Sequence, residues 1–121
     1  MSYDDKNIFA KILRGEIPCN KIYEDDYVLS FYDINPQKKI HALVIPKGKY
    51  INLDDFNDKA SSEEMVGLLK GITTVANKLG ISFNTGKGYR ALINISEHGG
   101  QEVPHLHFHL FGGEKIGKMV E

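Results

Sequence analysis

The chain has 121 residues, of which 41% are hydrophobic and 26% charged, and fifteen Lys and Arg against sixteen Asp and Glu give a net charge of -1. This composition predicts one globular domain over residues 1–121 and excludes collagen-like, disordered and disulfide-scaffold proteins. Because no stretch concentrates positive charge, we expect no nucleic acid partner. The polar, acidic start at residues 1–6 and the lack of a long apolar run predict no membrane contact and a cytoplasmic location.

The first part of the chain predicts a short helix followed by three strands. Apolar residues recur at helical spacing at Ile8, Phe9, Ile12 and Leu13. Residues 21–24 and 27–33 are β-favouring runs close together in sequence, which predicts a hairpin. Turn-forming residues at 34–37 then lead to a near-continuous apolar run at residues 41–46, which is typical of a central strand.

The rest of the chain predicts one long helix and two more strands. After Ser61, apolar side chains recur at three- and four-residue steps as far as Gly80, and Ser61 and Glu64 have the spacing of a capping box. Residues 89–95 and 105–111 are the fourth and fifth predicted strands, with a loop between them. The order of elements predicts an α+β fold, a five-stranded antiparallel sheet with one short and one long helix.

Two glycines interrupt the long predicted helix. Gly67 and Gly71 lie one helical turn apart, and glycine lowers helix stability. One interpretation is a close approach of a neighbouring backbone, such as that of a second subunit, and the other is a pair of glycines that the helix simply tolerates.

Three alternating histidines make the last predicted strand unusual. His105, His107 and His109 are each followed by a large apolar residue, so on a strand all three would share one face. They could be only the polar face of a half-buried strand. However, Lys, Thr or Glu would serve that purpose without titrating near pH 7.

A metal site is a second interpretation of the histidines. The Cα atoms of residues 105 and 109 would lie about 13 Å apart on a regular strand, so three rings cannot reach one ion at about 2.0–2.1 Å. At most two could chelate, with a further ligand from His41, His98, Cys19 or a carboxylate, and local spacing marks none of these. We therefore predict no metal site and no cofactor.

The third interpretation gives the rings different roles, with one as nucleophile and its neighbours binding or orienting. At an ordinary pKa of about 6.5, a histidine is mostly neutral at pH 7 and has a free lone pair. His107 lies in the middle and is placed to attack an atom that its neighbours hold. The preceding loop, residues 99–101, contains two glycines and would let backbone N–H groups approach an anion such as phosphate.

These residues resemble a known family. Residues 105–111 resemble the signature of the histidine triad (HIT) family, and residues 94–113 resemble its histidine triad nucleotide-binding branch. Matching segments continue in order along nearly the whole chain, at residues 8–12, 16–18, 24–26, 31–36 and 41–47.

The resemblance implies a homodimer in which two five-stranded sheets join, with one purine nucleotide site per subunit. It implies hydrolysis of purine nucleoside phosphoramidates, above all adenosine 5′-monophosphoramidates, and of acyl nucleotides. His107 would form a nucleotidyl-histidine intermediate, His105 would orient the site, and His109 would contact the α-phosphate. The matching nucleotide-binding positions, besides His107 and His109, are Phe9, Ile12, Phe31, Asp33, Ile34, His41, Asn94, Gly100, Gln101 and Glu102.

Some of these positions have plainer interpretations. Asp33 suits vicinal ribose hydroxyls as an acceptor, but it could equally be a turn cap before Pro36. Phe9 and Phe31 offer faces on which a purine can pack, and they would also suit an ordinary core.

The chain departs from the family pattern at two places. Many bacterial and archaeal relatives have a Cys-x-x-Cys pair that contributes to a zinc site, whereas Asn7 and Ala10 stand there in this chain. Glu102 occupies a position where some members have a serine thought to assist the leaving group. The proton donor to the leaving group, Glu102 or His98, therefore stays open.

Three alternative functions stay open as well. The same residues could bind a nucleotide or a protein partner without turnover, as a regulatory module. A dinucleoside polyphosphate hydrolase of the same superfamily is the second alternative, and a metal-dependent hydrolase is the third. The natural substrate and the choice between adenosine and guanosine are not predicted.

Overall fold

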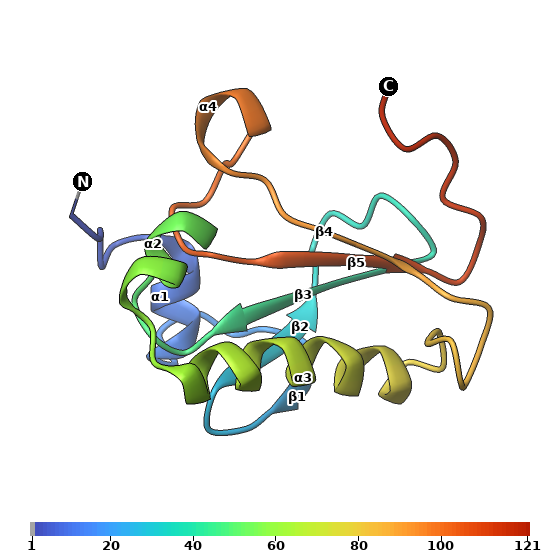
Figure 1. The fold of residues 1–121 in the computed structure, drawn as a ribbon, viewed down its shortest axis with the longest axis horizontal. Coiled ribbons are helices and arrows are strands. Elements are labelled where there is room, and N and C mark those ends of the chain that lie inside the picture. Colours follow the sequence, from blue (N-terminus) through green and yellow to red (C-terminus); the bar gives the residue numbers. More distant parts are fainter. Residues whose placement is uncertain (1) are drawn as a thin grey trace.

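The computed structural model describes residues 2–121 and contains, in that part, five strands in one sheet and four helices (Figure 1). The strands are β1 Lys21–Glu24, β2 Val28–Tyr32, β3 Ile40–Pro46, β4 Arg90–Leu92 and β5 Phe108–Gly112. The helices are α1 Ile8–Leu13, α2 Leu53–Lys59, α3 Ser62–Lys78 and α4 Ser96–Gly99. The predicted α+β fold with a five-stranded antiparallel sheet is confirmed. None of the helices over residues 2–121 is both long and apolar enough to cross a membrane.

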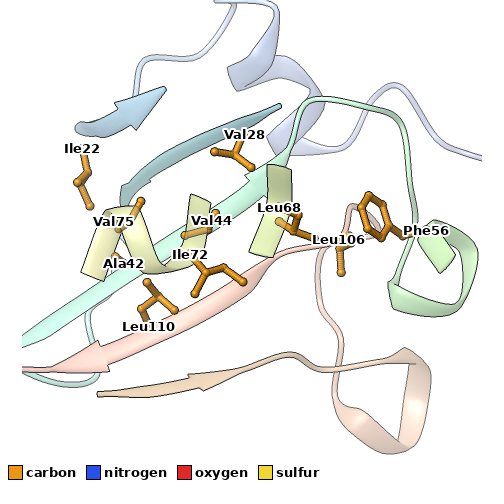
Figure 2. Packing of buried hydrophobic residues seen from close by; sticks show 10 residues of the cluster. All are labelled: Ile22, Val28, Ala42, Val44, Phe56, Leu68, Ile72, Val75, Leu106 and Leu110. Carbon is orange, nitrogen blue, oxygen red and sulfur yellow. The ribbon is translucent and has the colours of Figure 1, made fainter. Parts of the chain in front are cut away.

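The sheet has the strand order β1-β2-β3-β5-β4, and every neighbouring pair is antiparallel. Alternate side chains of each strand point to opposite faces. On one face, α3 covers the larger apolar cluster, which Figure 2 shows in detail. On the other face, Phe9 of α1 packs with Leu29, Phe31, Leu43 and Ile45. The sheet therefore has two covered faces, and the histidines described below lie on the α1 side.

The long helix begins as predicted. The Ser61 side chain accepts a hydrogen bond from the Glu64 backbone N–H at 3.1 Å, and the Glu64 carboxylate accepts one from the Ser61 N–H at 3.1 Å. These reciprocal bonds satisfy two free donors of the first turn. At the other end Gly80 has a φ of +72°, a backbone conformation that glycine adopts at little cost. The capping box and the stop signal are both confirmed.

Ahead of the last strand, the structure differs from the sequence prediction in three elements. Helix α2 was not expected, because Phe56 is its only buried residue and a single apolar side chain gives no detectable period. The loop predicted at residues 96–104 contains the single-turn helix α4. The strand predicted at residues 89–95 is a strand only over Arg90–Leu92.

The last strand begins three residues later than predicted. The His105 backbone N–H donates to the carbonyl oxygen of Val103 at 2.9 Å, and the Leu106 N–H donates to that of Tyr50 at 2.8 Å. Because these donors are used in loop contacts, pairing with β3 starts only at Phe108, opposite Val44. His105 and His107 therefore precede β5, and only His109 belongs to it.

The two glycines of α3 face side chains of the same chain. A Cβ atom added at Gly67 would lie 2.5 Å from Cγ of Tyr27, and one at Gly71 would lie 2.8 Å from Cγ2 of Val28. The part of the same chain that comes close to both glycines is thus the segment at the start of β2.

Replacing Gly71 by Ala is expected to lower the free energy of unfolding by roughly 1–3 kcal/mol, because Val28 is fully buried and cannot move aside. In an uncrowded helix interior, replacing Gly by Ala would raise the free energy of unfolding by about 1 kcal/mol. Thr73→Ala, at an exposed site of the same helix, is the matched control and should be neutral or slightly stabilising. Urea unfolding of both variants checks the prediction, and a stabilised Gly71→Ala protein would contradict it.

Candidate active site

The central histidine has one nitrogen tied to the backbone. Nδ1 of His107 lies 2.7 Å from the carbonyl oxygen of His105. A carbonyl can only accept, so Nδ1 carries the hydrogen and Nε2 keeps its lone pair. Burial lowers the pKa of His107, which keeps the ring neutral at pH 7. His107 therefore has the protonation state that a nucleophile or a general base needs.

His105, the first of the three histidines, supports the site from within the core and does not contact a ligand. His105 is fully buried, and its Nε2 donates to the carbonyl oxygen of Pro46 at 2.9 Å. Its Nδ1 accepts a hydrogen bond from the Tyr3 hydroxyl. Burial lowers the pKa of His105 to about 4, so the ring is neutral and both nitrogens are satisfied. His105 can hold its neighbours in place, but it has no free atom to offer a ligand.

The third histidine is oriented by a hydrogen-bonded chain that starts in the turn before β3. The Gln37 backbone N–H donates to Nδ1 of His41 at 3.2 Å, so Nε2 of His41 carries the hydrogen. This nitrogen lies 2.9 Å from Nδ1 of His109 and 3.5 Å from Oδ2 of Asp33. Because Nδ1 of His109 accepts, its Nε2 is a donor. Burial lowers the pKa of His109 to about 4 and also lowers that of His41.

Asp33, His41 and His109 also satisfy the geometric requirement for a metal site, since their ligand atoms lie within 4.8 Å of one another. A metal on Nε2 of His41 would require the hydrogen to be on Nδ1. That nitrogen faces the Gln37 N–H, and two N–H groups would then point at each other. The donor set fits a hydrogen-bonded chain better than a metal ion.

A hollow of about 200 Å³ opens beside His107 and His109. Seven of the predicted site residues line it: Phe9, Asp33, Asn94, Gly100, Glu102, His107 and His109. The ring of Phe9 lies edge-on to that of His107, with 5.0 Å between their centroids. None of the residues that line the hollow is Lys or Arg, so N–H groups are the donors available to an anion there.

Other predicted residues lie outside the hollow. Phe31 and Ile12 belong to the apolar cluster around Phe9 on the α1 side of the sheet. The side chain of Ile34 is 84% exposed. His41 does not line the hollow, but it contacts three residues that do: His109, Asp33 and Gln37.

Gln101 stabilises the loop instead of facing the hollow. Its amide nitrogen donates to the carbonyl oxygens of Ile51 and Val103 at 2.6 and 3.0 Å, and its amide oxygen accepts from the Ser96 N–H at 3.0 Å. Ser96 has a φ of +58°, which is uncommon for a non-glycine residue. The Gln101 side chain thus holds the loop that carries Asn94 and Gly100 over the hollow.

Four lining residues were not predicted: Asn35, Gln37, Leu43 and Val103. Asn35 and Gln37 follow Asp33 in a turn that the sequence did indicate, and the Asn35 N–H donates to Oδ1 of Asp33 at 2.8 Å. Asp33 is therefore a turn cap and a lining residue at the same time. Leu43 lies on the same sheet face as His109, its pairing partner in β5, and this register was the only signal that could have placed it.

A family model described as the HIT domain matches residues 14–116. The chain belongs to the HIT family. It is 41% identical over 117 residues to a purine nucleoside phosphoramidase from Escherichia coli, covering 96% of this chain and 94% of that protein. An uncharacterized HIT-like protein from Azospirillum brasilense is 49% identical over 119 residues, covering 98% and 95%.

Solved structures agree with this membership. A HIT family hydrolase from Clostridium thermocellum superposes with a TM-score of 0.86 at 36% identity, covering 98% of this chain and 99% of that one. A histidine triad protein from Clostridium difficile has a TM-score of 0.81 at 40% identity, with 98% coverage of both chains. The predicted HIT family is confirmed, and these relatives support a hydrolase function.

Proposed function

We propose that this HIT protein is a purine nucleoside phosphoramidase that acts through a nucleotidyl intermediate on His107. The observation that carries the proposal is the contact between Nδ1 of His107 and the His105 carbonyl, which leaves Nε2 as the free nucleophilic nitrogen. The 41% identity to a purine nucleoside phosphoramidase from Escherichia coli supports it. Acyl nucleotides would react in the same way, with a carboxylate as the leaving group.

The reaction has two displacements at phosphorus. Nε2 of His107 attacks the α-phosphorus, a P–N bond to the histidine forms, and the P–N bond to the leaving amine breaks as that amine takes up a proton. Water then attacks the same phosphorus and releases the nucleoside monophosphate, and His107 regains its neutral ring. Glu102 lines the hollow and His98 lies four residues earlier in α4, so both are candidates for the proton donor.

The surrounding groups suit a nucleotide with its phosphate beside His107. Nε2–H of His109, Asn94 and the backbone at Gly100 would meet the phosphate oxygens, and such donors favour the charge that develops there. Asp33 would accept from the ribose hydroxyls. Small-molecule sites are typically roughly 300–1,000 Å³, so the base and the leaving group would extend beyond this hollow, towards Ile34 and the exposed rim.

Replacing His41 by Phe is expected to lower kcat roughly 10-fold. Phenylalanine keeps the packing against Phe111, whose ring centroid lies 4.3 Å from that of His41, but removes the donor that fixes His109. Steady-state kinetics measures the effect, and thermal unfolding shows whether the variant is folded. An unchanged kcat in a folded variant would rule out this orienting role.

We propose further that the protein is a homodimer whose sheets join, as the family resemblance implies. In this chain β4 is an outer strand of the sheet, so it has an edge at which another strand can pair. Light scattering on a size-exclusion column is expected to give about twice the chain mass of 13.6 kDa. A mass of one chain would contradict this assembly.

The experiment that tests the function follows the release of AMP from adenosine 5′-monophosphoramidate by chelator-treated protein. Turnover without metal, and faster than on a dinucleoside polyphosphate, is the expected result. Faster turnover of the polyphosphate would favour the related hydrolase activity, and recovery only after adding a divalent cation would favour a metal-dependent enzyme. Binding of AMP by calorimetry with no turnover of either substrate would identify a nucleotide-binding module instead.

A further inference from the structure

The segment ahead of α1, residues 2–7, is called here the N-terminal strap. It is held by its own contacts. The Asn7 amide nitrogen donates to the Asp4 carbonyl oxygen at 2.7 Å, and its amide oxygen accepts from the Ala10 N–H at 2.9 Å, which caps α1. Asp5 pairs with Lys49 at 2.9 Å and so ties the strap to the segment after β3. The strap is therefore a structured part of the domain.

Tyr3 connects this strap to the histidines. Its hydroxyl bonds to Nδ1 of His105, and the two rings meet edge-on with centroids 5.6 Å apart. Burial raises the pKa of the Tyr3 hydroxyl, so it stays protonated and able to donate. Nε2 of His105 is already committed to the Pro46 carbonyl, which leaves Nδ1 as the acceptor. Within residues 2–121, the Tyr3 hydroxyl is the group in hydrogen-bond contact with that nitrogen.

His105 in turn holds the nucleophile. Its backbone carbonyl accepts from Nδ1–H of His107 at 2.7 Å. The position of this carbonyl depends on where the buried His105 side chain is anchored, between the Pro46 carbonyl on one side and Tyr3 on the other. A hydrogen-bonded chain therefore runs from the strap through His105 to His107. Tyr3 belongs to this hydrogen-bonded chain, although the proposed reaction gives it no role.

We propose that Tyr3 is a positioning residue for His107, and that it acts by fixing the tautomer and the orientation of His105. The proposal rests on the proposed function for its kinetic part. Without the hydroxyl, Nδ1 of His105 would be a buried acceptor with no donor, and the ring would gain freedom to turn or to exchange its hydrogen between the two nitrogens. The His105 carbonyl would then hold His107 less well, which slows attack at phosphorus but leaves nucleotide contacts intact.

Tyr3→Phe keeps the ring and removes only the hydroxyl. We expect kcat on adenosine 5′-monophosphoramidate to fall roughly 10-fold, as for the loss of one buried hydrogen bond in the transition state, with KM unchanged. Tyr23→Phe is the matched control, because it removes a tyrosine hydroxyl bonded to Asp25 at 2.8 Å on the β1 edge of the sheet, away from the histidines. That control should keep the wild-type kcat.

The ¹⁵N spectrum of the imidazoles provides a readout that needs no turnover. In the wild type, Nδ1 of His105 should be an unprotonated acceptor and Nδ1 of His107 should carry a hydrogen. In Tyr3→Phe the His105 signals should broaden or move towards the other tautomer, and the His107 Nδ1–H signal should weaken. Wild-type kcat, or an unchanged His105 spectrum, in the Tyr3→Phe protein would overturn the proposal.

Failure of the proposed function would look different. In that case wild type, Tyr23→Phe and Tyr3→Phe would all lack turnover of the phosphoramidate. The ¹⁵N spectra of wild type and Tyr3→Phe then decide alone whether Tyr3 sets the state of His105: a changed spectrum supports that role and an unchanged one overturns it.

Discussion

Replacing His107 by Ala is expected to lower kcat for phosphoramidate hydrolysis by at least ~1,000-fold, the scale seen when a covalent nucleophile is removed. Neither His105 nor His109 can take its place. His105 is fully buried with both nitrogens engaged, and Nδ1 of His109 is occupied by His41 while its Nε2 carries a hydrogen. Of these three rings, only that of His107 has an unprotonated nitrogen, Nε2, beside the hollow. The measurement is the rate of AMP release under saturating substrate.

Binding and chemical rescue separate this prediction from a loss of fold. AMP affinity should change little in His107→Ala, because Asp33, Asn94 and His109 still line the hollow. In His107→Gly, added imidazole should restore part of the rate by filling the space of the missing ring. Acid-quenched wild type should carry a nucleotidyl adduct by mass spectrometry, and the variants should not. An active His107→Ala protein would remove the covalent mechanism altogether.

Moving from about pH 7.5 to about pH 5 is expected to lower the free energy of unfolding by several kcal/mol. The pKa values of His105 and His109 are both about 4 in the folded protein, against about 6.5 in the unfolded chain. Between these values the unfolded state binds more protons, so stability rises with pH and is lost as the pH falls below about 6.5. Each of the two rings contributes about 2 kcal/mol to the loss at pH 5, and His107 and His41, whose pKa values are also lowered, act in the same direction.

Urea unfolding at several pH values between about 5 and 7.5 tests this. This pH range lies above the usual titration of carboxyl groups, so the histidines dominate the change in the free energy of unfolding with pH. His109→Asn removes one of the buried rings and should make the free energy of unfolding depend less on pH. Equal or greater stability of the wild type at pH 5 would contradict the buried, neutral state of these histidines.

The elements that the sequence predicted well are those whose signals are local. The capping box at Ser61 and Glu64 uses contacts within four residues, and the apolar period of α3 repeats over 17 residues. Both can therefore be recognised from the sequence alone. Helix α2 was missed because one buried residue, Phe56, makes no pattern. The late start of β5 was missed because the donors of His105 and Leu106 are taken by Val103 and Tyr50, and the second of these contacts lies far away in sequence.

The sequence alone determined the family and the α+β class, and it predicted the alternating histidines as the reactive group. It also placed Asp33, Asn94, Gly100 and Glu102 near them through the family resemblance. It did not determine which of the residues that match the family's nucleotide-binding positions point away from the hollow. Gln101 is one of them, because its side-chain amide bonds to the backbone of Ile51 and Val103.

What only the tertiary structure decided is the hydrogen-bonding state of each ring. His109 takes its donor from His41, 68 residues earlier, and His105 bonds to Pro46, 59 residues earlier, and to Tyr3, 102 residues earlier. A neutral imidazole has one donor and one acceptor nitrogen, and its neighbouring groups decide which nitrogen carries the hydrogen. Those neighbours come together only when the sheet and the N-terminal strap are folded, so the roles of the three histidines are properties of the fold and not of their spacing.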